Sequence, residues 1–129
     1  MGCRDYPAPQ LVHALEQFNR GEYWAQHETL EEIWRAERDE SIRNFYKGVL
    51  QIGVGLYHLT RQNYSGAIKV LTRGISYLRP YSPRCFGVNV ARLIDESTRI
   101  LERAHAREEI AANDFPRVHF EIINHKSEI

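Results

Sequence analysis

The chain has 129 residues, of which 43% are hydrophobic and 26% are charged, and its 17 lysine and arginine residues balance 17 aspartate and glutamate residues. This length suits one domain, and the composition is that of an ordinary globular protein, which excludes collagen-like and disordered chains. The formal net charge of zero argues against extended contact with nucleic acid or an anionic membrane, so we expect neither partner.

Apolar residues recur at helical spacing in three segments of the first half of the chain. The first predicted helix covers about 9–20 and ends at Gly21, and the second covers about 22–36. The third begins near Ser41 and is apolar on nearly every side. Helices of that kind are surrounded by others, so we expect the third helix to be central.

Two further helices and an extended tail are predicted in the second half. The fourth helix follows Asn63 and ends near Arg79, because Pro80 disfavours helical backbone in the residue before it. The fifth begins after Asn89, a suitable N-cap. Alternating apolar residues then predict an extended segment that docks on the bundle without forming a sheet. We therefore expect an all-α fold: a single helical domain over 1–129, with a compact bundle of about five helices over 9–110 and a C-terminal tail over 111–129.

The sequence favours a cytoplasmic location. Its two cysteines, Cys3 and Cys85, are too few for a disulfide framework, and Cys3 lies close to the N-terminus. The N-terminal residues lack the apolar stretch of a signal peptide, and the most apolar window, 49–59, is too short and too polar to span a bilayer. We therefore expect neither secretion nor membrane insertion.

The densest group of chemically active side chains lies on the second predicted helix. At about 100° per residue, His27 falls on the inward arc and Glu31 lies about 40° from it. On the third helix, Gln51 and His58 share a polar edge of an otherwise apolar surface. Because buried polar groups need partners, we expect one polar cluster between the two helices, which either binds a ligand or only fixes their packing. The candidate residues are Tyr23, Trp24, His27, Glu28, Glu31, Arg35, Gln51 and His58.

A metal site is the alternative use of this cluster. The segment from His27 to Glu31 is close to the zinc-protease motif H-E-x-x-H, but Glu31 stands where the second histidine would be. A mixed site would need His58 as its third ligand, and Glu28 would then be free to act as a base on a metal-bound water. Since Arg35 can neutralise Glu31 without an ion, we expect no bound metal and no cofactor. A metal-dependent hydrolase remains the alternative function.

The same helix carries a resemblance to a known family. Its motif is Phe18-Asn19-x-Gly21-Glu22-Tyr23-Trp24-x-x-His27-Glu28-x-Leu30-Glu31-x-x-Trp34-Arg35. Later segments agree in type and order, such as Phe45-Tyr46-x-Gly48-Val49-x-Gln51 and Leu56-Tyr57-His58. Over roughly residues 11–105, the chain resembles the small bacterial and archaeal proteins catalogued as domain of unknown function 309. The resemblance implies an all-helical cytoplasmic domain and no particular activity.

Two classes of function stay open. A module that binds a small molecule or a protein would need only an exposed aromatic or apolar patch. An enzyme would need the polar cluster to be open to solvent beside a pocket. We favour the binding module, and the sequence leaves open whether the chain is an enzyme. Tyrosine and tryptophan residues near helix ends are compatible with a homodimer.

Overall fold

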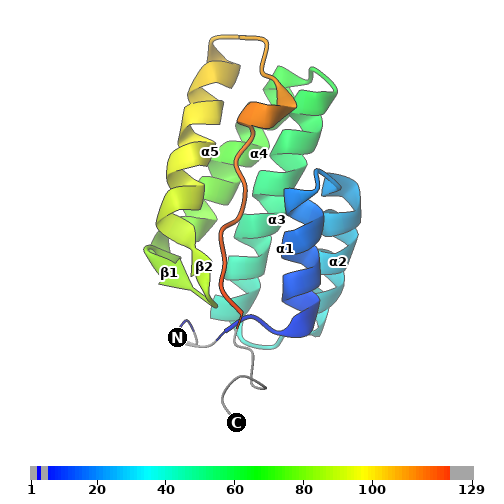
Figure 1. Ribbon diagram of the computed structural model, residues 1–129, viewed down its shortest axis with the longest axis vertical. Helices are drawn as coiled ribbons and strands as arrows, with labels where there is room; N and C mark the ends of the chain where they lie inside the picture. The colour runs from blue at the N-terminus through cyan, green and yellow to red at the C-terminus, as the bar shows by residue number, and fades with distance from the viewer. Residues whose placement is uncertain (1–2, 4–5, 123–129) are drawn as a thin grey trace.

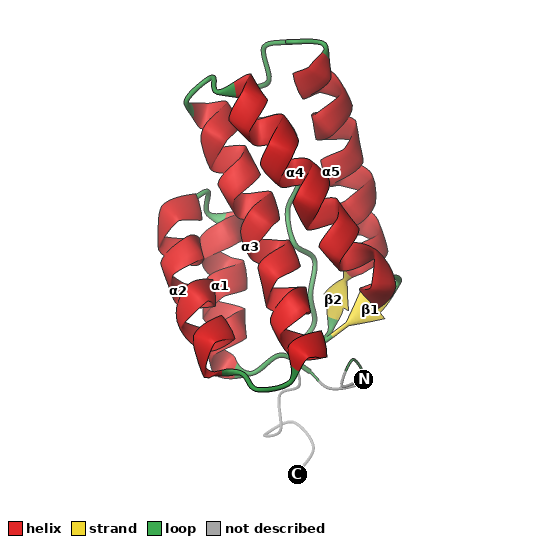
Figure 2. Cartoon of the chain, turned by 180° about the vertical axis from the view of Figure 1, so that it is seen from behind, coloured by secondary structure: helices red, strands yellow, loops and turns green. Residues whose placement is uncertain are grey.

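The computed structural model describes Cys3 and residues 6–122, and the helices of this part of the chain form a bundle in which successive helices run side by side (Figures 1 and 2). Within these residues the predicted all-α fold with about five helices is confirmed, and the predicted helix ends agree closely with those observed. Residues 123–129 of the predicted tail lie outside the described residues. The helices are α1 (Pro9–Asn19), α2 (Tyr23–Ala36), α3 (Glu40–Thr60), α4 (Tyr64–Leu78) and α5 (Val90–His105).

Local signals in the sequence set the helix ends. Gly21 follows α1 with a φ of 78°, which glycine adopts without steric cost. The side-chain oxygen of Asn63 accepts a hydrogen bond from the Gly66 backbone N–H at 3.1 Å, at the start of α4. Asn89 accepts in the same way from the Arg92 backbone N–H at 3.0 Å, so the predicted N-cap of the fifth helix is confirmed.

Helix α3 lies at the centre of the bundle, as predicted. It packs against α2 on one side and α4 on the other (Figure 2). Its residues Phe45, Val49, Ile52 and Leu56 have no exposed surface. The extended apolar surface of this helix is therefore shared between two neighbours, which explains why its sequence is apolar nearly all round.

The residues after α5 run back along the bundle as an extended segment, which we call the strap (111–122). In Figure 1 it is the orange to red segment that passes between α1 and α5. The Asn19 side chain holds it through two hydrogen bonds with Val118, donating to its carbonyl at 2.8 Å and accepting from its N–H at 2.7 Å. Its own side chains Phe115 and Val118 are buried. Residues 111–122 of the predicted tail are thus docked on the helical bundle, as expected.

A small hairpin corrects two expectations. The loop before α5 contains two short antiparallel strands, β1 (Arg84–Cys85) and β2 (Val88–Asn89), and Phe120 of the strap bridges to Val88. The prediction that the tail docks without any sheet pairing is therefore wrong. On the opposite side, the Phe86 N–H donates to the Cys3 carbonyl at 3.2 Å, and Cys3 and Cys85 form a disulfide. Both cysteines are paired although the cysteine count predicts no disulfide framework, because the hairpin gathers segments that are distant in sequence.

None of the helices in the described part of the chain combines the length and the apolar character needed to cross a bilayer.

Candidate functional site

One row of side chains on α2 joins three of the predicted site residues. His27 Nε2 lies 3.8 Å from one carboxylate oxygen of Glu31, and an Arg35 nitrogen lies 3.2 Å from the other. Each partner stands one turn from the next, the spacing at which helix side chains meet. The side chains of His27 and Glu31 are 24% and 35% exposed, so this row is open to solvent and is not a sealed internal network.

Aromatic rings extend this row onto α3. The indole of Trp24 stacks on the His27 ring, with centroids 4.9 Å apart and planes 20° from parallel. Tyr57 of α3 packs beside Trp24 at 5.6 Å, and the Arg61 guanidinium lies 5.7 Å from the Tyr57 ring centre. Trp24 is 54% exposed, which is unusual for so large an apolar ring. We call His27, Trp24 and Tyr57, in which Trp24 contacts both other rings, the aromatic ladder.

The structure brings only part of the predicted cluster together. His58 lies 6.2 Å from the Tyr57 ring, and its Nδ1 is 3.2 Å from the side-chain nitrogen of Asn63. Tyr57 and Trp24 therefore connect His58 to His27, and among the described residues no hydrogen bond joins the two histidines directly. Gln51 lies on the other flank of α3, next to Gly74 of α4. The contacts thus follow the edges of the helices and do not meet at one point.

Glu28 borders an open hollow on the outer side of α2. The hollow has a volume of about 510 Å³ and is lined by Glu28, Glu31, Glu32, Arg35 and Ala36. Only one of these side chains is cationic, and Arg35 is already paired with Glu31. The hollow is consequently rich in carboxylate oxygens and adjoins the aromatic ladder through Glu31.

The metal alternative requires ligands that the helices do not bring together. Across residues 3 and 6–122 the structure forms no group of three or more histidine, cysteine, aspartate or glutamate side chains that could hold a metal ion. His27 and Glu31 are neighbours, but the rings of Trp24 and Tyr57 stand between them and His58 along the chain of contacts.

Gln26 is a buried polar residue that contacts the backbone of His27 beneath the aromatic ladder. It is not among the candidate site residues predicted from the sequence. Its side chain is fully buried, with the amide oriented so that its nitrogen donates to the Val49 carbonyl at 3.3 Å and its oxygen accepts from the His27 N–H at 2.9 Å. Gly53 leaves room for this side chain, because a Cβ at Gly53 would lie within 2.9 Å of the Gln26 amide group. The signal in the sequence is a polar residue at core spacing, three residues after Tyr23 and four before Leu30.

Tyr23, a predicted ligand residue, belongs to the core and stands apart from the ladder. It makes an edge contact with Phe18 at 5.6 Å and packs on Phe115 of the strap at 6.3 Å. Burial raises the pKa of Tyr23 to about 12, and the nearby positive charge of Arg117 opposes this shift. Its position indicates that Tyr23 holds the strap against the first two helices.

The raised pKa of Tyr23 predicts a loss of stability in strong alkali. The folded-state pKa lies above that of an unfolded tyrosine, about 10, so the neutral phenol favours folding below pH 10 and this contribution disappears as the pH rises through 12. We expect the free energy of unfolding in urea to fall more between about pH 9 and pH 11.5 for the wild type than for Tyr23→Phe. Equal losses in the two proteins would contradict the assignment.

The fold is that of a small helical domain, and its α2 motif is shared with a known protein family. Residues 11–70 match the model of the family described as Domain of unknown function (DUF309), which confirms the resemblance over these residues. The chain is 31% identical over 74 residues to the Uncharacterized protein YpuF of Bacillus subtilis (strain 168), which covers 57% of this chain and 42% of that protein. It is 23% identical over 86 residues to an uncharacterized protein of Aquifex aeolicus (strain VF5). This match covers 67% of this chain and 26% of that protein. The chain therefore spans less than half the length of either relative.

Proposed function

We propose that this chain is a cytoplasmic binding module whose aromatic ladder takes a small ligand with a positively charged group. The observation that carries the proposal is the exposed indole of Trp24, stacked on His27 and adjoining a hollow lined by carboxylates. A cation over an indole or phenol ring gains about 0.5–2 kcal/mol, and carboxylates add attraction of the same sign. Arg61 already uses the Tyr57 ring in this way within the chain.

The geometry supports binding better than hydrolysis. A hydrolase that used His27, Glu31 and His58 as metal ligands and Glu28 as base would need all three ligands about 2.0–2.2 Å from one ion. Among the described residues, His58 contacts the Asn63 side chain, and no three histidine, cysteine, aspartate or glutamate side chains lie together where they could hold a metal ion. The ladder is also the kind of surface that a protein partner or a second copy would cover, and these occupants are outcomes of the test below.

A thermal-shift experiment with paired ligands tests the proposal. We expect arginine, spermidine or choline to raise the melting temperature, and citrulline, the neutral counterpart of arginine, to have no effect. At a ligand concentration of 100 times Kd, the stabilisation is about 2.7 kcal/mol. The shift should disappear in Trp24→Ala and persist in Glu16→Gln, which removes an exposed carboxylate from α1.

Three outcomes would contradict this proposal. The first is a cation-induced shift that survives Trp24→Ala, and the second is a protein that none of the three cations stabilises. The third is near-stoichiometric metal in untagged protein that is lost in His27→Ala, which would favour the hydrolase. Light scattering completes the experiment, because a dimer that dissociates in Trp24→Ala would assign the ladder to a homodimer interface.

A further inference from the structure

The charges of this neutral chain are unevenly distributed along it. None of its 17 aspartate and glutamate residues lies between Ser41 and Ile94, the stretch that contains α3 and α4. The total charge of zero, on which the expectation of no nucleic-acid partner rests, therefore conceals a basic hairpin beside the acidic helix α2. The same stretch carries eight lysine and arginine residues: Arg43, Lys47, Arg61, Lys69, Arg73, Arg79, Arg84 and Arg92.

Five of these cations gather on one face of the α3–α4 hairpin. At about 100° per residue, Arg43, Lys47 and Arg61 fall within one arc of about 40° on α3 or directly after it. On α4, Lys69 and Arg73 precede Tyr77 at successive four-residue steps, and the Lys47 ammonium lies 5.9 Å from the centre of the Tyr77 ring. The two rows are thus neighbours. We call Arg43, Lys47, Arg61, Lys69 and Arg73 the basic face.

The cations of this face lack internal counter-ions. Within the described residues, no carboxylate lies within 4.0 Å of any of the five, whereas Arg92, Arg99 and Arg103 of α5 are all paired with acids. Arg43 and Lys47 even share one ring, at 5.4 and 5.0 Å from the centre of Trp34, although like charges one turn apart repel. Such a cluster gains stability from an anion supplied from outside.

The face is also accessible. Figure 2 shows α3 and α4 side by side on the near side of the bundle, with no other segment crossing over them. Lys69, Arg73 and Arg61 are exposed, and no carboxylate lies between them. The basic face therefore presents positive charge to solvent and contains no carboxylate.

We infer that the basic face binds the phosphodiester backbone of a single-stranded nucleic acid, without preference for base sequence. The 18 steps from Arg43 to Arg61 cover about 27 Å, a length that suits a repeating anion better than one phosphate group. Half-exposed rings at the borders, Trp34, Tyr57 and Tyr77, are surfaces on which bases stack. These rings favour a single strand, because the bases of a duplex are stacked on one another and cannot reach them.

The inference predicts a steep dependence of binding on salt. Fluorescence anisotropy of a labelled 20-mer of oligothymidylate reports binding up to about 100 µM protein, the weak end for nonspecific complexes. If all five cations contact phosphates, the logarithm of the affinity falls with that of the salt concentration with a slope of about −3.5. Affinity should then drop about 100-fold between 50 and 200 mM salt.

Variants of exposed residues distinguish binding at the basic face from nonspecific adsorption of the oligonucleotide. The double variant Lys69→Gln, Arg73→Gln should bind more weakly and lose only about 20-fold over the same salt range, because two contacts are removed. Both residues are exposed, so its melting temperature should match that of the wild type. The matched control Arg92→Gln, Arg99→Gln removes two ion-paired cations of α5 and should leave both the affinity and the slope unchanged.

Several results would overturn the inference. They are no binding at 50 mM salt, an affinity independent of salt, or equal binding by the wild type and the α4 double variant. Tighter binding to polyglutamate would assign the face to an acidic protein, and tighter binding to phosphatidylglycerol vesicles would assign it to a membrane surface. Tighter binding to a duplex of the same length would refute the single-strand assignment.

Discussion

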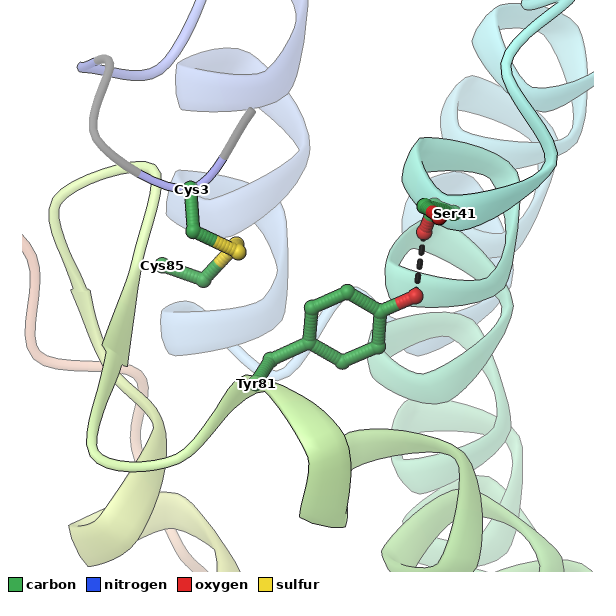
Figure 3. Close-up of a disulfide and its surroundings, with 4 residues drawn as sticks. All are labelled: Cys3, Ser41, Tyr81 and Cys85. Carbon is green, nitrogen blue, oxygen red and sulfur yellow. Dashed lines mark hydrogen bonds between the residues drawn. A yellow bond between two sulfur atoms is a disulfide. The ribbon is translucent and has the colours of Figure 1, made fainter. Parts of the chain in front are cut away.

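Opening the Cys3–Cys85 disulfide is expected to lower the free energy of unfolding by about 4.5 kcal/mol. The two cysteines are 82 residues apart in the sequence, so the bond closes a loop over most of the chain (Figure 3). A cross-link of that span removes much of the conformational freedom of the unfolded chain, and reduction restores it. Urea unfolding with and without a dithiol reductant measures the difference directly.

Cys3→Ser provides the control for this measurement. Its free energy of unfolding should equal that of the reduced wild type and should not respond to the reductant. Two outcomes would contradict the expectation: equal unfolding midpoints for the oxidised and reduced wild type, or two titratable thiols in wild-type protein that is denatured without reductant.

The reduced chain should nevertheless remain folded, because contacts other than the disulfide hold the β1–β2 hairpin against α3. Phe45 packs edge-on against Tyr81 and Phe86, with ring centres 5.4 Å away in both pairs. The Tyr81 hydroxyl donates a hydrogen bond to the Ser41 carbonyl at the start of α3 (Figure 3). These contacts join the hairpin to the central helix without help from the disulfide. Reduction should therefore lower the stability of the fold without unfolding it.

The parts of the fold that depend on neighbouring residues could be predicted from the sequence. Helical periodicity and the caps at Asn63 and Asn89 depend on residues only a few positions apart. The helices and their starting points can therefore be predicted from the sequence. The hairpin could not be predicted, because its pairing with Phe120 and its bond to Cys3 join segments far apart in sequence. Two-residue strands carry too little alternation to be recognised.

The same division applies to the candidate site. The row from His27 through Glu31 to Arg35 follows from four-residue spacing within one helix. The contact of Trp24 with Tyr57 depends on how α2 crosses α3, which spacing does not determine. The buried amide of Gln26 on α2 packs against Gly53 on α3. This contact beneath the aromatic ladder helps to determine how the two helices cross.

Gly74→Val is expected to lower the free energy of unfolding by about 3 kcal/mol, because the α3 backbone leaves no room for a side chain where Gly74 stands. A Cβ at this position would lie 3.0 Å from the Ile52 backbone nitrogen and 2.9 Å from the Ile52 Cδ1 atom. Backbone cannot move aside as a flexible side chain can, so the helices must separate. At Gly66, by contrast, a Cβ would meet the Asn63 cap of its own helix and not another helix.

Ser76→Val on the exposed side of α4 controls for the lower helix propensity of a β-branched residue. Because that side chain meets no neighbouring helix, its expected cost is only about 0.5 kcal/mol in the same urea experiment. If the two variants lose equal stability, the close approach of α3 and α4 is refuted. If only Gly74→Val is destabilised, its oligothymidylate affinity should fall as well, because wider spacing of α3 and α4 separates the cations of the two helices.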